Sequence, residues 1–203
     1  MKYKIAETFY SVQGEGDWVG TPASFIRLAR CNVHCEWCDT DYSVHREASI
    51  DELVAEVLSK PAKKVIITGG EPALQDTQPL VVELRKHKIK THVETNGTLP
   101  MHFDWDWVTV SPKGPVEGLD PLVMHMANEV KFVISDKASI VYMEEVLAKY
   151  PIKQKFVIPL SRPWPYKLAD SFIPENMQAA LSYCLVNPDF RLCVQLHKVI
   201  GVR

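Results

Sequence analysis

The sequence lacks the features that mark several classes of protein. No segment reaches the roughly 18 apolar residues that a membrane-spanning helix needs. The first residues, MKYKIAETFYSVQGEG, have no apolar core of about 7–15 residues, so they do not resemble a secretory signal peptide. Runs of like charge are absent and the net charge is −2, which argues against a nucleic-acid-binding surface. We therefore expect a cytosolic protein whose partners include neither membrane nor nucleic acid.

The composition is that of an ordinary globular protein. The chain has 203 residues, of which 46% are hydrophobic and 24% charged, enough for one domain with its own core. No internal repeat or linker divides it, so we expect a single domain over residues 1–203. One long irregular segment, SRPWPYKLADSFIP (161–174), is a candidate lid or dimer arm.

Short apolar segments alternate with stretches of helical periodicity. Residues 64–68, 129–134 and 155–159 are rich in β-branched side chains, which is typical of parallel strands covered on both faces. An eight-fold barrel takes about 250 residues, so this alternation predicts an α/β fold of the partial, open, TIM-like barrel type with few full helices. The expected strands are Ile5–Val12, Ser24–Ala29, Lys64–Thr68, Thr91–Glu94, Trp107–Val110, Glu129–Ile134, Lys155–Pro159 and Phe190–Leu196. The expected helices follow a Ser49–Glu52 capping box, span about Gln78–His87 and Ala138–Tyr150, and begin again at Pro174.

Four candidate motifs directly follow four of these strands. A cysteine cluster follows SFIRLA, TGGEP follows KVII, ETNG follows THV, and SPKG follows WVTV. Ligands of parallel α/β sheets gather at the carboxyl ends of the strands. We therefore expect these four loops to share one rim.

The cysteines are few, but three of the five lie within eight residues, as Cys31, Cys35 and Cys38. A structural zinc site would need a fourth ligand from a second knuckle, and the sequence has no such pair. A [4Fe–4S] cluster held by three thiolates instead leaves one iron open to a substrate or cofactor. We favour the cluster and keep a non-catalytic zinc module as the alternative. Cys184 and Cys193 lie in apolar segments and are expected to be buried packing residues.

The spacing C-x3-C-x-aromatic-C is similar to the signature of the radical S-adenosylmethionine (SAM) superfamily, and the GGEP stretch at 69–72 resembles a second motif of that superfamily. The resemblance implies a partial (β/α)6 barrel in which SAM binds the open iron. Reductive cleavage of SAM then gives a 5′-deoxyadenosyl radical that abstracts a hydrogen atom. Paired glycines suit close approach of a ligand to the backbone. The residues implied in SAM binding are Trp37, Asp39, Gly70, Glu71, Ser111 and Lys113.

A narrower resemblance runs from FYSVQGEGDWVGTPASFIRLARCNVHCEWCDTDYS to the terminal QLHKVIGVR, and it is to the 7-carboxy-7-deazaguanine synthases. It implies contraction of 6-carboxy-5,6,7,8-tetrahydropterin with loss of ammonia on the route to queuosine. It also implies a Mg²⁺ ion on Thr40, a homodimer, and an electron donor such as flavodoxin or ferredoxin. Within the superfamily, the rival is an activase that makes a glycyl radical on a protein partner. The residues implied in substrate binding are Val12, Gln13, Gly14, Glu15, Arg27, Thr68, Glu94, His197 and Arg203.

Arg27 also raises a question of its own, because an arginine in an apolar strand is costly to bury without a partner. A substrate carboxylate would satisfy it in a bidentate manner. A structural salt bridge within the protein would do so equally well. The sequence alone leaves both possibilities open.

Overall fold

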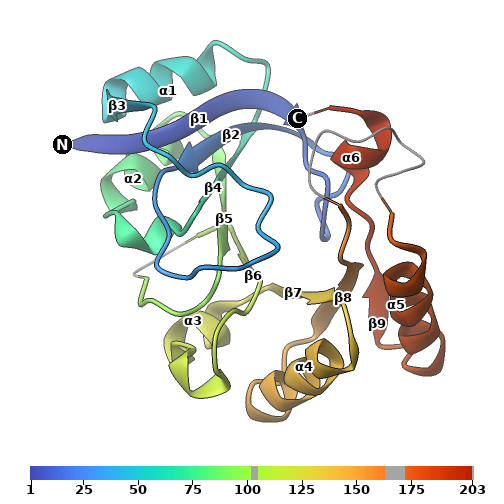
Figure 1. Cartoon of the computed structure of the whole chain (residues 1–203). Helices are drawn as coiled ribbons and strands as arrows, with labels where there is room; N and C mark the ends of the chain where they lie inside the picture. The colour runs from blue at the N-terminus through green and yellow to red at the C-terminus, as the bar shows by residue number, and fades with distance from the viewer. Residues whose placement is uncertain (102–104, 163–171, 203) are drawn as a thin grey trace.

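The computed structural model describes residues 1–101, 105–162 and 172–202 (Figure 1). Most of the irregular segment 161–174 therefore lies outside the described residues. The elements in chain order are β1 (Lys2–Val12), β2 (Pro22–Leu28), β3 (Arg46–Ser49), α1 (Ile50–Leu58), β4 (Lys64–Gly69), η1 (Pro72–Leu74), α2 (Gln78–Lys86), β5 (Lys90–Thr95), β6 (Trp107–Val110), η2 (Val116–Gly118), α3 (Pro121–Met126), β7 (Glu129–Ile134), α4 (Lys137–Lys149), β8 (Gln154–Pro159), α5 (Pro174–Val186), β9 (Phe190–Leu192) and α6 (Leu196–Ile200).

The strands form one mixed sheet in the order β3-β1-β2-β4-β5-β6-β7-β8-β9. Strands β2 and β4 to β9 pair in parallel, whereas β1 is antiparallel to both β2 and β3. The parallel sheet that the strand–helix alternation predicted is thus present in β2 and β4 to β9, but β1 departs from it. Only residues 13–21 join β1 to β2, which is too short for the crossover of a dozen or more residues that parallel neighbours require. Figure 1 shows the sheet curving, with α1 to α5 around its outer side.

Helix α1 begins where the local chemistry predicts. Ser49 accepts a hydrogen bond from the N–H of Glu52, and the Glu52 carboxylate accepts one from the N–H of Ser49, so the capping box is present at α1. The short helices α3 and α6 and the four-residue strand β3 were not expected. Helix α6 begins at Leu196, where the last strand was expected to end; that strand stops at Leu192.

Two apolar cores lie between the sheet and its helices. One joins β1, β2 and β4 to α1 and α2, with Ile26, Leu53 and Leu80 fully buried. The other joins β5 to β8 to α3, α4 and α5. Among the described residues, no helix is long and apolar enough to cross a membrane. A smaller number of polar and charged side chains is also buried, among them Glu71, Glu129 and Lys131. These three belong to the site described next.

Candidate active site

The cysteine loop lies between β2 and β3 and is closed at its base by a hydrogen bond from the N–H of Arg30 to the carbonyl of Tyr42, at 2.8 Å. Cys31, Cys35 and Cys38 are all free thiols and all line one cavity of about 220 Å³. A turn brings the last two together, because the N–H of Cys38 donates to the carbonyl of Cys35 at 3.0 Å. The three cysteines are thus gathered at one cavity, as their spacing predicts.

The glycine turn after β4 packs directly against this loop. A Cβ on Gly70 would lie 2.1 Å from the carbonyl oxygen of Arg30 and 2.7 Å from the Cβ of Cys31. The N–H of Glu71 donates to the same carbonyl of Arg30 at 2.9 Å. Gly69 has φ +152, and a Cβ there would lie 2.2 Å from the carbonyl oxygen of Leu28. Only glycine allows this approach of two backbones, which is what the paired glycines predict.

Glu71 does not line the cysteine cavity, and its expected contact with SAM stays a prediction. It is fully buried and accepts hydrogen bonds from the hydroxyl of Thr95 and the N–H of Asn96, each at 2.7 Å, and from the N–H of Ala73 at 3.0 Å. Burial raises the pKa of Glu71, and these donors partly offset the increase. Its carboxylate therefore holds the turn to the end of β5 from behind.

Lys113 brings a positive charge to the cysteines. Its ammonium group donates to the hydroxyl of Ser111 at 2.7 Å and lies 5.2 Å from the centre of the Trp37 ring. Burial lowers the pKa of Lys113 to about 8, although Cys35 opposes this change. Burial raises the pKa of the Cys35 thiol, and Lys113 in turn opposes that. Of the six residues implied in SAM binding, all except Glu71 line the cysteine cavity.

These residues fit an iron–sulfur cluster. Three thiols from one loop, glycine backbone in close contact with that loop, and a lysine share one cavity. Within the described parts of the chain, no three Cys, His, Asp or Glu side chains converge as ligands of a single metal ion. A cluster does not require such convergence, because its thiolates bind different irons.

A second cavity of about 830 Å³ adjoins the first. The two share wall residues from opposite ends of the sequence, among them Thr40, Thr68 and Lys198. Thr40, which was implied in Mg²⁺ binding, thus faces both cavities. Arg203 lies outside the described residues. The other residues implied in substrate binding all line the larger cavity: Val12, Gln13, Gly14, Glu15, Arg27, Thr68, Glu94 and His197.

Arg27 has a partner within the protein. Its Nε donates to Oε1 of Glu7 at 2.7 Å, so the structural salt bridge left open by the sequence is present. The guanidinium carbon lies 5.9 Å from the ring of Phe9, which stacks on Phe25 with 4.6 Å between ring centres. This ion pair orients the guanidinium at the cavity wall beside a stacked aromatic pair.

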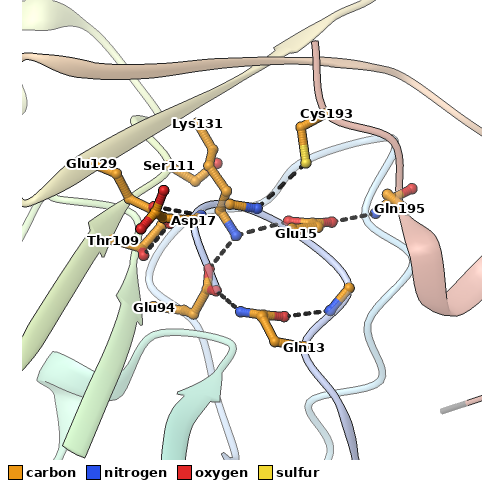
Figure 2. Close-up of polar contacts among 12 residues, drawn as sticks. Gln13, Glu15, Asp17, Glu94, Thr109, Ser111, Glu129, Lys131, Cys193 and Gln195 are labelled. Carbon is orange, nitrogen blue, oxygen red and sulfur yellow. Dashed lines mark hydrogen bonds and ion pairs between the residues drawn. The ribbon is translucent and has the colours of Figure 1, made fainter. Parts of the chain in front are cut away.

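Lys131 of β7 lies between two glutamates and was missed in the sequence (Figure 2). Its ammonium group contacts Oε2 of Glu15 at 2.7 Å and Oε2 of Glu94 at 2.5 Å. Gln13 donates to the other oxygen of Glu94 at 2.7 Å, and Gln195 donates to the other oxygen of Glu15 at 2.8 Å. Lys131 is only 3% exposed. A lysine inside the buried strand EVKFVI was the available signal, because such a charge needs partners.

The two carboxylates differ in acidity although they share one cation. Burial raises the pKa of Glu15, but the charges of Lys131 and His197 together lower it by more, so that the pKa is about 2. Burial raises the pKa of Glu94, and Lys131 offsets only part of that increase. Glu15 and Glu129 add to it by like-charge repulsion. Glu94 is therefore the carboxylate that would gain more from further hydrogen-bond donors.

The loop that carries Glu15 is held in place by Glu129 and Cys193. The buried carboxylate of Glu129 accepts from the N–H of Asp17 at 2.8 Å and from the hydroxyl of Thr109 at 2.7 Å. The N–H of Gly16 donates to the thiol of Cys193 at 3.3 Å, so this buried cysteine supports the loop as well as packing (Figure 2). The backbone between β1 and β2 therefore has little freedom at the cavity.

The segment from Gln195 to Lys198 joins both loops and was only partly foreseen. The N–H of Leu196 donates to the carbonyl of Gly14 at 2.9 Å, and the ring of His197 fills the space where a Gly14 side chain would lie. The ammonium group of Lys198 contacts Asp39 of the cysteine loop and the hydroxyl of Ser161. Helix α6 thus completes the wall between the two cavities.

Comparison with known proteins identifies the family of this chain. The family model of the radical SAM superfamily matches residues 25–133. A 7-carboxy-7-deazaguanine synthase from Synechocystis is 36% identical over 208 residues, covering 100% of this chain and 95% of the relative. Another from Bacteroides thetaiotaomicron is 37% identical over 203 residues, covering 100% of each chain. The crystal structure of QueE from Escherichia coli matches with a TM-score of 0.80 at 29% identity, covering 97% of this chain and 95% of that one. The chain therefore belongs to the radical SAM superfamily and, within it, to the 7-carboxy-7-deazaguanine synthase family.

Proposed function

We propose that this protein converts 6-carboxy-5,6,7,8-tetrahydropterin to 7-carboxy-7-deazaguanine with loss of ammonia, a radical SAM reaction of queuosine and deazapurine biosynthesis. The observation that supports this most is the pair of adjoining cavities. One is lined by the three cysteines, and the other by residues able to bind a carboxylate and a donor-rich ring. Because the two cavities adjoin, a substrate bound in the second would lie beside a cofactor held in the first.

In the cysteine cavity, Cys31, Cys35 and Cys38 would hold the [4Fe–4S] cluster. When bound, the cluster and SAM supply a 5′-deoxyadenosyl radical, which is chemistry that the protein's own side chains lack. Around that site lie Trp37, Asp39, Gly70, Ser111 and Lys113. Glu71 keeps the glycine turn in place from behind. The protein's part is to position the reacting groups and to limit water.

In the larger cavity, the charges suggest an orientation for the substrate. Arg27 faces the substrate carboxylate, and Thr40 offers a hydroxyl to Mg²⁺, whose other ligands come from water and from that carboxylate. Glu94 accepts from the N–H groups of the pyrimidine edge, with Gln13 and Thr68 beside it. His197 closes the cavity against Gly14. We also propose Arg203 as a substrate contact, on the family resemblance.

The remaining features are proposed from the family. They are a single domain over the whole chain, a partial (β/α)6 barrel formed by the parallel strands, a homodimer, a cytosolic location, and flavodoxin or ferredoxin as the electron donor. The curved sheet and its outer helices support the barrel (Figure 1). These features affect how the enzyme is supplied with electrons and assembled, not the chemistry assigned to the two cavities.

The test is anaerobic incubation of the reconstituted protein with SAM, Mg²⁺, a reductant and carboxytetrahydropterin. We expect 7-carboxy-7-deazaguanine to form with a brown preparation that holds about four irons per chain. A colourless, zinc-loaded preparation would support the metal-binding module instead. An intact cluster with no deazaguanine product would reject the proposed substrate.

Arg27→Ala separates this function from that of a glycyl-radical activase. We expect it to lose product formation while still cleaving SAM, because Arg27 lies in the larger cavity and not in the cysteine cavity. Arg46→Ala is the matched control, since Arg46 pairs with Glu56 and lines neither cavity. Equal activity of the two variants would contradict the role of Arg27.

A further inference from the structure

A single buried cation serves both carboxylates at the wall between the two cavities. Lys131 reaches Glu15 and Glu94 from β7, and all three residues line both cavities (Figure 2). One positive charge against two negative charges leaves a net charge of about −1 where the substrate ring is proposed to lie. Without the lysine, two glutamates would face each other in a buried site, and one of them would take up a proton.

The two glutamates are held differently by their other partners. Glu15 has Gln195 as a further donor and belongs to a loop fixed by Glu129. Among the described residues, Glu94 has Gln13 as its one further hydrogen-bond donor, and it lies near the end of β5 between the cavities. Glu15 is therefore the fixed partner of Lys131, and Glu94 is the one available to a ligand.

We propose that Lys131 is a positioning and specificity-determining residue, which keeps Glu94 ionised and aimed at the donor-rich edge of the substrate. This inference rests on the proposed function, and it identifies the donor-rich edge of the substrate as the part whose binding depends on the buried cation. Lys131 acts through Glu94, so it is not itself a catalytic group. An ionised Glu94 favours a ring edge that carries several N–H groups, and it disfavours a ring edge that carries acceptors.

The charged and titratable groups around this wall come from every element packed against it. They are Glu15 after β1, Asp39 in the cysteine loop, His92 and Glu94 on β5, Lys113 after β6, Glu129 and Lys131 on β7, and His197 and Lys198 on α6. Burial lowers the pKa of His92 well below its ordinary value, so this imidazole is neutral. Its Nε2 lies 2.7 Å from the hydroxyl of Thr109, which donates to Glu129, so Nε2 carries the hydrogen. His92 therefore cannot replace Lys131 as a cation.

The test uses fluorescent 6-carboxypterin as a probe of the anaerobic holoenzyme with SAM and Mg²⁺. Lys131→Met should weaken binding at least about tenfold at pH 7, because the two buried carboxylates then face each other without their shared cation and a charge-assisted hydrogen bond of Glu94 to the ring edge is lost. The loss should shrink as the pH rises to about 9, because Glu94 then ionises without the lysine. The ratio of variant to wild-type dissociation constants at each pH cancels titration of the probe itself. Lys155→Met on the neighbouring strand is the matched control, because Lys155 lines neither cavity.

A second variant keeps the test valid if Lys131→Met does not fold. The double variant Lys131→Met with Glu15→Gln restores the net charge of about −1 and removes the repulsion between Glu15 and Glu94. It should therefore bind the probe more tightly than the single variant, and its Glu94 should ionise at a lower pH. If only this double variant folds, its binding must still weaken, relative to wild type, as the pH falls from 9 to 6.

The outcomes separate the inference from the proposed function. Failure of wild-type protein to bind the probe would overturn both. Wild-type binding with an unchanged Lys131→Met variant, or with a loss that is equal at every pH, would overturn the inference alone. Failure of both variants to fold would also overturn it, because Lys131 would then be a determinant of the fold.

Discussion

Replacing Gly70 by alanine tests whether the turn after β4 sets the position of the cysteine loop. Gly70 does not have a positive φ, so an alanine there adds no backbone strain. Its methyl group would lie 2.1 Å from the carbonyl oxygen of Arg30 and 2.7 Å from the Cβ of Cys31. An unstrained contact needs about 3.4 Å or more, so the cysteine loop must move by about 1 Å.

That displacement has an energetic and a chemical consequence. Inserting a methyl group into a packed site costs about 1–3 kcal/mol, so the free energy of unfolding should fall by that amount. The hydrogen bond from the N–H of Glu71 to the carbonyl of Arg30 weakens as the two backbones separate. Cys31 moves with Arg30, and we therefore expect Gly70→Ala to bind less iron than wild type.

Two measurements check this prediction: urea unfolding of the cluster-free protein, and iron per chain after anaerobic reconstitution. Gly118→Ala is the matched control, since Gly118 also has no positive φ and its added Cβ would meet nothing closer than Pro115 Cγ at 3.5 Å. If Gly70→Ala matches Gly118→Ala in both stability and iron content, the close approach does not position the loop and the reasoning is refuted.

Three further predictions concern the polar contacts of the site. In either orientation of the new amide, Glu71→Gln places its N–H₂ group against a backbone N–H that donates to Glu71 in the wild type, that of Ala73 or that of Asn96. The free energy of unfolding in urea should therefore fall by about 1–3 kcal/mol, and an unchanged value would contradict this. The pKa of Glu15, about 2, lies below its ordinary 4.5, so the ionised group stabilises the fold above pH 4.5 and this contribution is lost as the pH falls toward 2. Acid unfolding should therefore show a shallower pH dependence in Glu15→Gln than in wild type, and identical curves would argue against it. Lys198→Met should free Asp39 and speed amide hydrogen exchange in residues 38–43, whereas Lys198→Arg should not; equal exchange in the two variants would rule the contact out as an anchor.

The sequence predicted most of the fold because its strongest patterns are local. β-branched runs and a capping box depend on neighbouring residues, so β6 and β7 were placed with the observed bounds and α1 with its N-cap. The direction of β1 is not local, because an alternating strand has the same pattern in either orientation. β3 has four residues, REAS, which carry no periodic signal. The short helices α3 and α6 are held by tertiary contacts and by caps such as Asp120.

The site was predictable where a motif occupies one loop, as with Cys31 to Cys38 and the glycine turn. It was not predictable where partners are distant in sequence, as with Lys131 and Glu15, which are 116 residues apart. Glu71 also has partners that are distant in sequence. Its position was found from the motif, but the direction of its side chain depends on Thr95 and Asn96, which β5 brings beside it only in the folded chain.

The contacts of the segment from Gln195 to Lys198 also set an order of assembly during protein synthesis. Gln195 bonds to Glu15, 180 residues earlier, and Lys198 to Asp39, 159 residues earlier. The ribosome therefore releases the three cysteines long before it releases the helix that anchors their loop. A nascent chain halted before Gln195 exposes the thiols beside an unfinished wall. The cysteine loop consequently gains its anchor, and the substrate cavity is completed, only after Gln195 to Lys198 have left the ribosome and folded against the loops.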